Sequence, residues 1–370
     1  MSATATRGTV VVADDSRLMR RVLSQTLRDS GYDVVGEAED GDAALQLCRS
    51  AKPDVMTLDL AMPGLDGMGV LRTLKRDGLD IPVGGVSAFR PAHGARAVDA
   101  LAEGAFDLIE KPKVGETLSD FGRQLDEKVF AAAGRSISRR RVGAVNGNGT
   151  ARVRTPSAPV VPRRDPHARA AAPAVKASPR RTGRPPVVVI ATSTGGPRAL
   201  AQLMPQLPSP LGAGVLMVQH MPPGFTGSLA ARLDNDSPLH VVEAQGGERI
   251  APGTALLAPG GSHLHLADAK SVRLGDGDPV GGLRPRADLT IQDVVDRHGG
   301  DVLLVVLTGM GNDGLAGARA VKAAGGRILV EAEETCAVYG MPRAIADAGL
   351  ADAVLPLHDL PAAIVEEVSR

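Results

Sequence analysis

The chain has 370 residues, which is enough for two domains that each bury a core. Its 42 Lys and Arg balance 42 Asp and Glu, so the overall charge gives no reason to expect nucleic-acid binding. Cys48 and Cys336 are far apart and form no CxxC motif, which argues against a disulfide framework or zinc site. The sequence has no apolar signal core and no run of about 18 apolar residues. We therefore expect a soluble cytoplasmic protein without membrane insertion.

Residues 7–130 alternate strand patterns with helix patterns. The expected strands are 9–13, 33–38, 55–59, 82–87 and 106–110, and the expected helices follow Ser16 and then cover 41–50, 68–76, 94–103 and 116–133. Five strands that alternate with five helices predict a doubly wound, parallel α/β sheet.

Polar residues follow the strands of this first domain. Asp14 and Asp15 follow the first strand, Asp59 ends the third, Ser87 ends the fourth and Lys111 follows the fifth. Because the carboxyl ends of parallel strands share one edge, these side chains should converge. Grouped carboxylates repel unless a cation lies among them, and such oxygen ligands suit Mg²⁺. Each residue alone could be an ordinary strand-end residue, but the agreement of four strand ends favours a phosphoryl-acceptor site.

The motifs VADDS, LDLAMPGLDG, VSA and EKP resemble the response-regulator receiver family over nearly this whole domain. The resemblance implies that Asp59 is the phospho-acceptor and that Asp14 and Asp15 share a Mg²⁺ site with it. It also implies that Ser87 and Lys111 sense the phosphate. Leu108 departs from the family, which usually carries an aromatic switch residue at this position.

Residues 131–186 lose the hydrophobic periodicity. The segment from Arg135 to Arg184 is rich in Pro, Ala and Gly and has 13 Lys and Arg against one acid, Asp165. This composition predicts a flexible basic linker between two acidic domains. A tether that loosely binds a domain, anionic lipid or nucleic acid is the less favoured alternative.

Residues 187–370 again alternate strand and helix patterns, which predicts a mostly parallel α/β domain. The expected strands begin with the apolar run before STGGP and continue at 215–219, 255–258, 303–307 and 327–330, with helices that include 289–297 and 315–324.

Three of the strand ends in this domain carry reactive side chains. Ser193 follows the first strand, His220 follows the strand VLMVQ, and Asp313 lies in a glycine-rich turn after VLLVVL. A hydroxyl, an imidazole and a carboxylate are the parts of an acyl-transfer triad. Taken singly, Ser193 could lie in a polar turn, His220 could be structural and Asp313 could cap the helix that follows it. The coincidence of all three favours the triad, although no GxSxG motif of the ordinary α/β-hydrolases is present.

The motifs STGGP, QHMPPGFT, LAPGGSHL, LTGMGNDG and YGMPRA resemble the catalytic domain of the chemotaxis protein-glutamate methylesterase/protein-glutamine glutaminase (CheB) family. That family also joins a receiver to this domain in this order. The resemblance implies Ser193, His220 and Asp313 as the triad, with Thr194 and Met310 lining the site. Thr192 and Arg286 differ from the family's usual residues. We expect neither to touch the triad, although Arg286 could alter substrate preference.

Together these features predict a phosphorylation-activated carboxylic ester hydrolase that demethylates chemoreceptors and deamidates their glutamines. Its partners would be methyl-accepting chemoreceptors and a chemotaxis histidine kinase, with Mg²⁺ in the receiver and no cofactor for the esterase step. We expect the unphosphorylated receiver to cover the cleft at Ser193. Two alternatives stay open: a response regulator whose output binds DNA or protein without catalysis, and a related esterase in another pathway.

Overall fold

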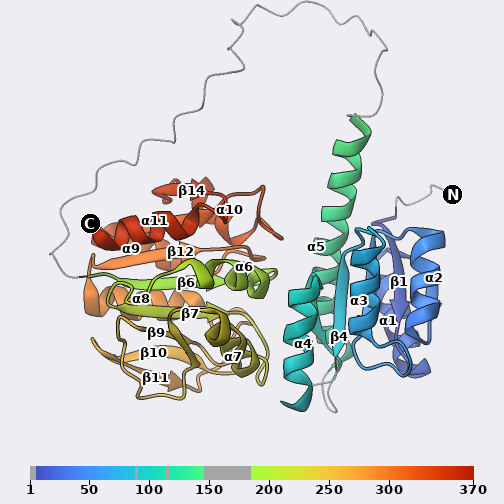
Figure 1. The fold of residues 1–370 in the computed structure, drawn as a ribbon, viewed down its shortest axis with the longest axis horizontal. Helices are drawn as coiled ribbons and strands as arrows, with labels where there is room; N and C mark the ends of the chain where they lie inside the picture. The colour runs from blue at the N-terminus through green and yellow to red at the C-terminus, as the bar shows by residue number, and fades with distance from the viewer. Residues whose placement is uncertain (1–5, 88–90, 113–116, 146–184) are drawn as a thin grey trace, which may run out of the picture.

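The computed structural model describes residues 6–87, 91–112, 117–145 and 185–370. They form two α/β domains that lie side by side (Figure 1). None of the helices in these ranges is both long enough and apolar enough to cross a bilayer.

The first domain has one five-stranded sheet in the order β2-β1-β3-β4-β5, and all of its strand pairs are parallel. Its strands are β1 (Thr9–Ala13), β2 (Asp33–Ala38), β3 (Val55–Asp59), β4 (Val83–Ser87) and β5 (Asp107–Glu110). Its helices are α1 (Arg17–Asp29), α2 (Gly41–Ala51), α3 (Gly67–Arg76), α4 (Pro91–Glu103) and α5 (Leu118–Val145). The predicted doubly wound fold is confirmed. Strands β3 and β4 are wholly buried and mostly apolar, because helices cover both faces of the sheet.

Short polar residues cap the starts of α1, α2 and α3. Ser16 caps α1, since its hydroxyl accepts a hydrogen bond from the Met19 amide at 3.4 Å, as the sequence predicts.

The end of α5 differs from the prediction. This helix continues beyond residue 133 to Val145, so the segment predicted as a flexible linker begins in a helix that projects past both domains (Figure 1). The rest of that segment, 146–184, lies outside the described residues, and the domain boundaries stay predictions.

The second domain has a parallel seven-stranded sheet in the order β14-β13-β12-β6-β7-β9-β8 and an antiparallel hairpin of β10 with β11. The strands are β6 (Val187–Thr192), β7 (Gly214–Gln219), β8 (His240–Glu243), β9 (Thr254–Leu257), β10 (His263–Asp268), β11 (Ser271–Gly275), β12 (Val302–Val306), β13 (Arg327–Glu331) and β14 (Ala353–Leu355). The helices are α6 (Gly196–Leu203), α7 (Thr226–Asp236), α8 (Ala287–His298), α9 (Leu315–Ala324), α10 (Met341–Asp347) and α11 (Leu360–Ser369), with the 3₁₀ turn Met204–Gln206 after α6. The mostly parallel α/β fold is confirmed.

Strand β6 is the centre of this second sheet. It pairs with β7 on one side and with β12 on the other, and all three strands are apolar and buried. The strand order changes direction at β6 and β12, and ligands bind at such switch points, beside the carboxyl ends of the strands. The fold therefore places a site where these strands end.

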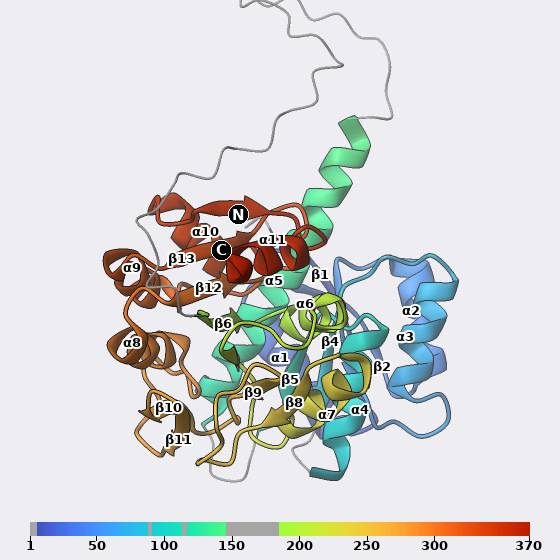
Figure 2. The same ribbon diagram turned by 60° about the vertical axis from the view of Figure 1, so that its left-hand side comes forward.

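The two domains are in direct contact. Helix α4 of the first domain packs against α6 and α7 of the second (Figures 1 and 2). Arg232 of α7 forms an ion pair with Asp99 of α4, with 2.6 Å between their N and O atoms. A cavity of about 370 Å³ lies between the domains and is lined from both sides, by Leu101 and Phe106 as well as by Arg198 and Gln202.

Candidate functional site

Ser193 lies in the turn between β6 and α6. Its backbone amide donates a hydrogen bond to the Thr308 carbonyl at 3.0 Å, which ties this turn to the loop after β12. Gly195 has φ of +81°, and a Cβ there would lie 2.3 Å from the Cβ of Ala337. Only glycine combines this backbone conformation with such close packing, so Gly195 keeps the turn tight around Ser193.

His220 directly follows β7 and lies beside Ser193. The paired residues Thr192 and Gln219 end the two neighbouring strands, so Ser193 and His220 are the next residues on each. Gln219 strengthens this arrangement because its side-chain amide donates to the Ser193 carbonyl at 2.9 Å and to the His220 carbonyl at 3.0 Å. The Gln219 side chain is buried, so it connects the backbones of the two residues away from water.

Asp313 is the acceptor for His220. Its Oδ2 atom lies 2.7 Å from Nε2 of the imidazole, and its carboxylate also accepts hydrogen bonds from the backbone amides of Ala287, Asp288 and Gly314. Asp313 therefore caps α8 from a distant loop. The sequence also allowed Asp313 to be the N-cap of the following helix α9. The structure shows Gly314 in that position instead, and α9 has no side-chain cap.

The environment of Asp313 keeps it ionised. Burial by itself raises the pKa of this carboxyl, but the hydrogen bond and charge of His220, with the amides of Ala287 and Asp288, outweigh burial and hold the pKa at about 2. A fixed carboxylate can orient an imidazole and stabilise its protonated form. Ser193 and His220 both belong to the described residues, and no hydrogen bond joins the Ser193 hydroxyl to the imidazole. Such contacts are often long before substrate binds.

Thr194 and Met310 lie on the two loops at this site. Thr194 is buried, its carbonyl accepts from the Thr308 hydroxyl at 2.9 Å, and its own hydroxyl donates to Asp107 of the first domain at 2.6 Å. Met310 is half-buried and follows Gly309, where a Cβ would lie 2.9 Å from the Cβ of Ser193. Thr194 directly follows Ser193, and Met310 follows the glycine that packs against Ser193; that these two residues line the substrate site stays a prediction.

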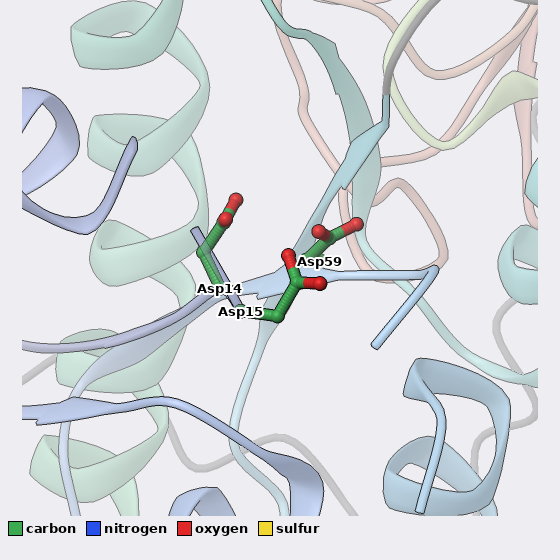
Figure 3. A group of neighbouring side chains, drawn as sticks. All are labelled: Asp14, Asp15 and Asp59. Carbon is green, nitrogen blue, oxygen red and sulfur yellow. The ribbon is translucent and has the colours of Figure 1, made fainter. Parts of the chain in front are cut away.

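A second group of side chains lies at the carboxyl edge of the first sheet. Oxygen atoms of Asp14, Asp15 and Asp59 all lie within 4.8 Å of one another (Figure 3). Asp14 and Asp59 are buried and Asp15 is exposed. Burial raises the pKa of Asp14 even though the nearby Lys111 ammonium acts to lower it. Three carboxylates this close, two of them buried, fit a hard divalent cation such as Mg²⁺, which would relieve their repulsion.

Lys111 lies against two of these three carboxylates. Its Nζ atom lies 2.8 Å from Oδ2 of Asp14 and 2.6 Å from Oδ2 of Asp59. Burial acts to lower the pKa of Lys111, but these two carboxylates hold it above the ordinary value. Ser87 is buried on β4, directly after the residue that pairs with Asp59, and its carbonyl accepts from the Lys111 amide at 2.9 Å. The predicted convergence is thus found for the side chains of Asp14, Asp15, Asp59 and Lys111, and the backbone of Ser87 lies beside them.

Comparison with known proteins agrees with this arrangement. The family model for the CheB methylesterase matches residues 188–364, and that for the response regulator receiver domain matches residues 10–120. A protein-glutamate methylesterase/protein-glutamine glutaminase of Symbiobacterium thermophilum is 42% identical over 98% of this chain and 97% of its own length. The chain belongs to the CheB methylesterase family. It is a hydrolase with a response regulator receiver domain at its N-terminal side.

Two further proteins are similar to this CheB family member. A protein of the same name from Moorella thermoacetica is 40% identical over 97% of this chain and 98% of its own length. Among solved structures, the CheB methylesterase catalytic domain of Thermotoga maritima is 43% identical, with 49% of this chain and 97% of that domain covered and a TM-score of 0.48.

The expectation that Thr192 and Arg286 do not touch the predicted triad is wrong. The His220 amide donates to the Thr192 carbonyl at 3.1 Å, because Thr192 ends β6 and His220 directly follows the paired strand β7. The Nε atom of Arg286 lies 3.4 Å from Oδ1 of Asp313. Sequence spacing could not reveal this contact, since Arg286 precedes α8 and reaches Asp313 only because that carboxylate caps α8.

Two supporting residues in this CheB domain were not predicted. Gln219 is adjacent to His220 in the QHMPP motif, so its position was visible, but its contacts were not. Glu331 ends the apolar strand β13 and is fully buried, where its Oε2 accepts from the Thr308 amide at 2.8 Å. Burial raises the pKa of Glu331. The sequence signal was a lone acid at the end of an apolar strand.

Proposed function

We propose that this chain hydrolyses glutamate methyl esters on chemoreceptors and deamidates receptor glutamines, with Ser193, His220 and Asp313 as its triad. The observation that carries the proposal is the 2.7 Å contact of His220 with a buried, ionised Asp313, beside the strand end that holds Ser193. The relatives named above carry these two activities in their names.

The reaction uses each residue of the triad in turn. Because Asp313 binds Nε2 of His220, that nitrogen holds the proton, and Nδ1 is left to accept the proton of the Ser193 hydroxyl. The Ser193 oxygen attacks the γ-carbonyl carbon, and the imidazolium then protonates the departing methanol or ammonia. Water, deprotonated by His220, releases the acyl group and restores the free glutamate side chain. Asp313 stabilises the imidazolium both when the acyl group forms on Ser193 and when water removes it.

Phosphorylation at Asp59 is the proposed control of this esterase. Asp14, Asp15 and Asp59 would hold Mg²⁺, which when bound supplies positive charge for phosphoryl transfer from a histidine kinase. Lys111 lies against Asp59 and would pair with the new phosphoryl oxygens, while Ser87 would donate its hydroxyl to them. Because Ser87 ends β4 and Lys111 follows β5, both residues would connect the phosphoryl group on Asp59 to these two strands.

The receiver restrains the esterase in the proposed unphosphorylated state. Asp107 on β5 accepts the Thr194 hydroxyl next to the nucleophile, and α4 packs on α6 and α7. Phosphorylation would shift the population toward an arrangement in which these contacts are broken. Leu108 lies beside Asp107 on β5, where it replaces the usual aromatic residue, so β5 itself would transmit the change.

The test is Ser193→Ala in the full-length protein, assayed by methanol release from methylated chemoreceptors. We expect methanol release to be abolished while phosphorylation of Asp59 proceeds at the wild-type rate. Wild-type methanol release by the variant would overturn the assignment of Ser193. The matched control is Ser193→Cys, which keeps a nucleophile and should retain more activity than the alanine variant.

A further inference from the structure

Arg286 has a protein partner at each of its three guanidinium nitrogens. Nη2 forms an ion pair with Oδ2 of Asp288 at 2.8 Å, Nη1 donates to the Val280 carbonyl at 3.0 Å, and Nε lies 3.4 Å from Oδ1 of Asp313. The side chain is 19% exposed. A Cβ at Gly281 would lie 2.7 Å from Nη1, so the loop before Arg286 closes tightly over the guanidinium. Arg286 is therefore held in place by protein contacts, beside the Asp313 carboxylate that binds His220.

The two oxygens of Asp313 have different partners. Oδ2 accepts from His220 and from the Ala287 amide, whereas Oδ1 accepts from the Asp288 and Gly314 amides and faces Arg286. The guanidinium thus lies on the side of the carboxylate away from the imidazole. A planar cation at this place restrains rotation of the carboxylate and keeps Oδ2 directed at His220.

Arg286 also balances a second carboxylate at the same helix end. Asp288 is mostly buried, and its Oδ1 accepts from the Gly317 amide at 2.9 Å, which holds it beside Asp313. Without Arg286, two neighbouring carboxylates would lie near His220 with only helix amides to offset them. The resulting negative potential would favour the imidazolium over the neutral imidazole that must accept the serine proton.

We propose that Arg286 is a positioning residue of the esterase, which holds the Asp313 carboxylate toward His220 and offsets the charge of Asp288. The inference rests on the proposed triad. Because its Nε atom faces Asp313 and its other two nitrogens are held by Asp288 and the Val280 carbonyl, Arg286 acts through Asp313. The sequence left open that Arg286 could alter substrate preference, and the present proposal assigns it a role at Asp313 instead.

The experiment measures kcat and KM against pH in full-length protein phosphorylated at Asp59, with methanol release from a peptide that carries a glutamate γ-methyl ester. The charged groups that the described structure links to His220 or Ser193 include Asp313 with Arg286 and Asp288, Glu331 through Thr308, and Asp107 with its partner Lys128 through Thr194. Using the same phosphorylated state keeps the receiver contribution equal in all variants. Thermal unfolding of each variant provides the check on folding.

Arg286→Gln should lower kcat roughly tenfold at neutral pH and move the acidic limb of the kcat/KM profile to higher pH by on the order of one unit. Arg286→Lys keeps the positive charge, so the acidic limb of its kcat/KM profile should stay near that of the wild type. Asp288→Asn removes a negative charge and should move this acidic limb to lower pH. This variant keeps a side-chain oxygen for the Gly317 amide and tests the charge effect without changing Arg286.

Arg284→Gln is the matched control, because Arg284 lies on the same loop and donates to the Gly277 carbonyl, away from Asp313. It should leave the profile unchanged. The proposal is overturned if Arg286→Gln and Asp288→Asn both leave the limb in place, or if Arg286→Gln raises KM alone, which would indicate substrate binding. Full activity of Asp313→Asn would instead show that the triad assignment itself is wrong.

Discussion

Thr194, the residue after the proposed nucleophile, donates its hydroxyl hydrogen to Asp107 of the receiver at 2.6 Å. Asp107 also pairs with Lys128 of α5 at 3.2 Å, and Lys128 binds the Leu108 carbonyl as well. The strand that carries Asp107, β5, continues directly to Lys111, which lies against Asp59 at the proposed phosphorylation site. One hydrogen bond thus connects β5, which leads to Lys111 beside Asp59, with the turn that holds Ser193.

Breaking this contact should activate the unphosphorylated enzyme. Asp107→Ala removes the acceptor for Thr194, and we expect basal methanol release to rise about tenfold or more, because a part-buried, charge-assisted hydrogen bond contributes about 1.5–3 kcal/mol to the closed state. Arg232→Ala is the comparison, since its ion pair with Asp99 is exposed and should contribute less. Unchanged basal activity in Asp107→Ala, with normal folding, would contradict a restraining role for this bond.

Removing the receiver should have a larger effect than any single interface substitution. Deletion of residues 1–186 frees α6, α7 and Thr194 from α4 and β5, so basal esterase activity should exceed that of the full-length unphosphorylated protein. The relevant measurement is kcat/KM on the same methyl ester substrate, with circular dichroism to verify the fold of the fragment. A folded fragment with equal or lower activity would be evidence against restraint by the receiver.

Asp313 should be indispensable for catalysis although it never contacts the substrate. Asp313→Asn keeps the shape of the side chain but can stabilise the wrong imidazole tautomer, and we expect kcat to fall by about 10³–10⁴-fold. Phosphorylation of Asp59 should be unaffected because the substituted residue lies in the other domain. A loss of less than tenfold would show that another residue orients His220.

The buried position of Asp313 also predicts how stability depends on pH. Its pKa is about 2 in the folded protein, against 3.8 for an unperturbed aspartate such as that of the unfolded chain. Its ionised form therefore stabilises the fold above about pH 4, and this stabilisation is lost as the pH falls toward 2. The expected contribution is about 2 kcal/mol. Urea unfolding of wild-type and Asp313→Asn proteins should show their free-energy difference shrinking over this range, whereas a constant difference would contradict the prediction.

Mg²⁺ should stabilise the receiver by relieving repulsion among Asp14, Asp15 and Asp59. We expect the thermal midpoint of the full-length protein's receiver transition to rise with Mg²⁺ and to fall back with EDTA, following the usual dependence on ligand concentration. Asp15→Asn should weaken this response, while Glu39→Gln, which changes an exposed nearby carboxylate, should not. An equal Mg²⁺ response in both variants would place the ion elsewhere.

The sequence alone predicted both folds and most of the candidate site. Uninterrupted apolar runs such as that before STGGP predict buried parallel strands, and the carboxyl ends of such strands share one edge. For this reason Ser193, His220 and Asp313 could be grouped from their places along the chain, as could Asp14, Asp59 and Lys111. Both inferences need only local patterns and the geometry common to parallel sheets.

The tertiary structure decided which polar atoms meet across different elements. Asp313 caps α8 and not its own helix α9, and only that packing brings Arg286 within 3.4 Å of it. The contact of Thr194 with Asp107 depends on how two separate domains dock, which no periodicity within either domain encodes. Such contacts join residues many positions apart, and their distances are set by the packing of whole helices and sheets.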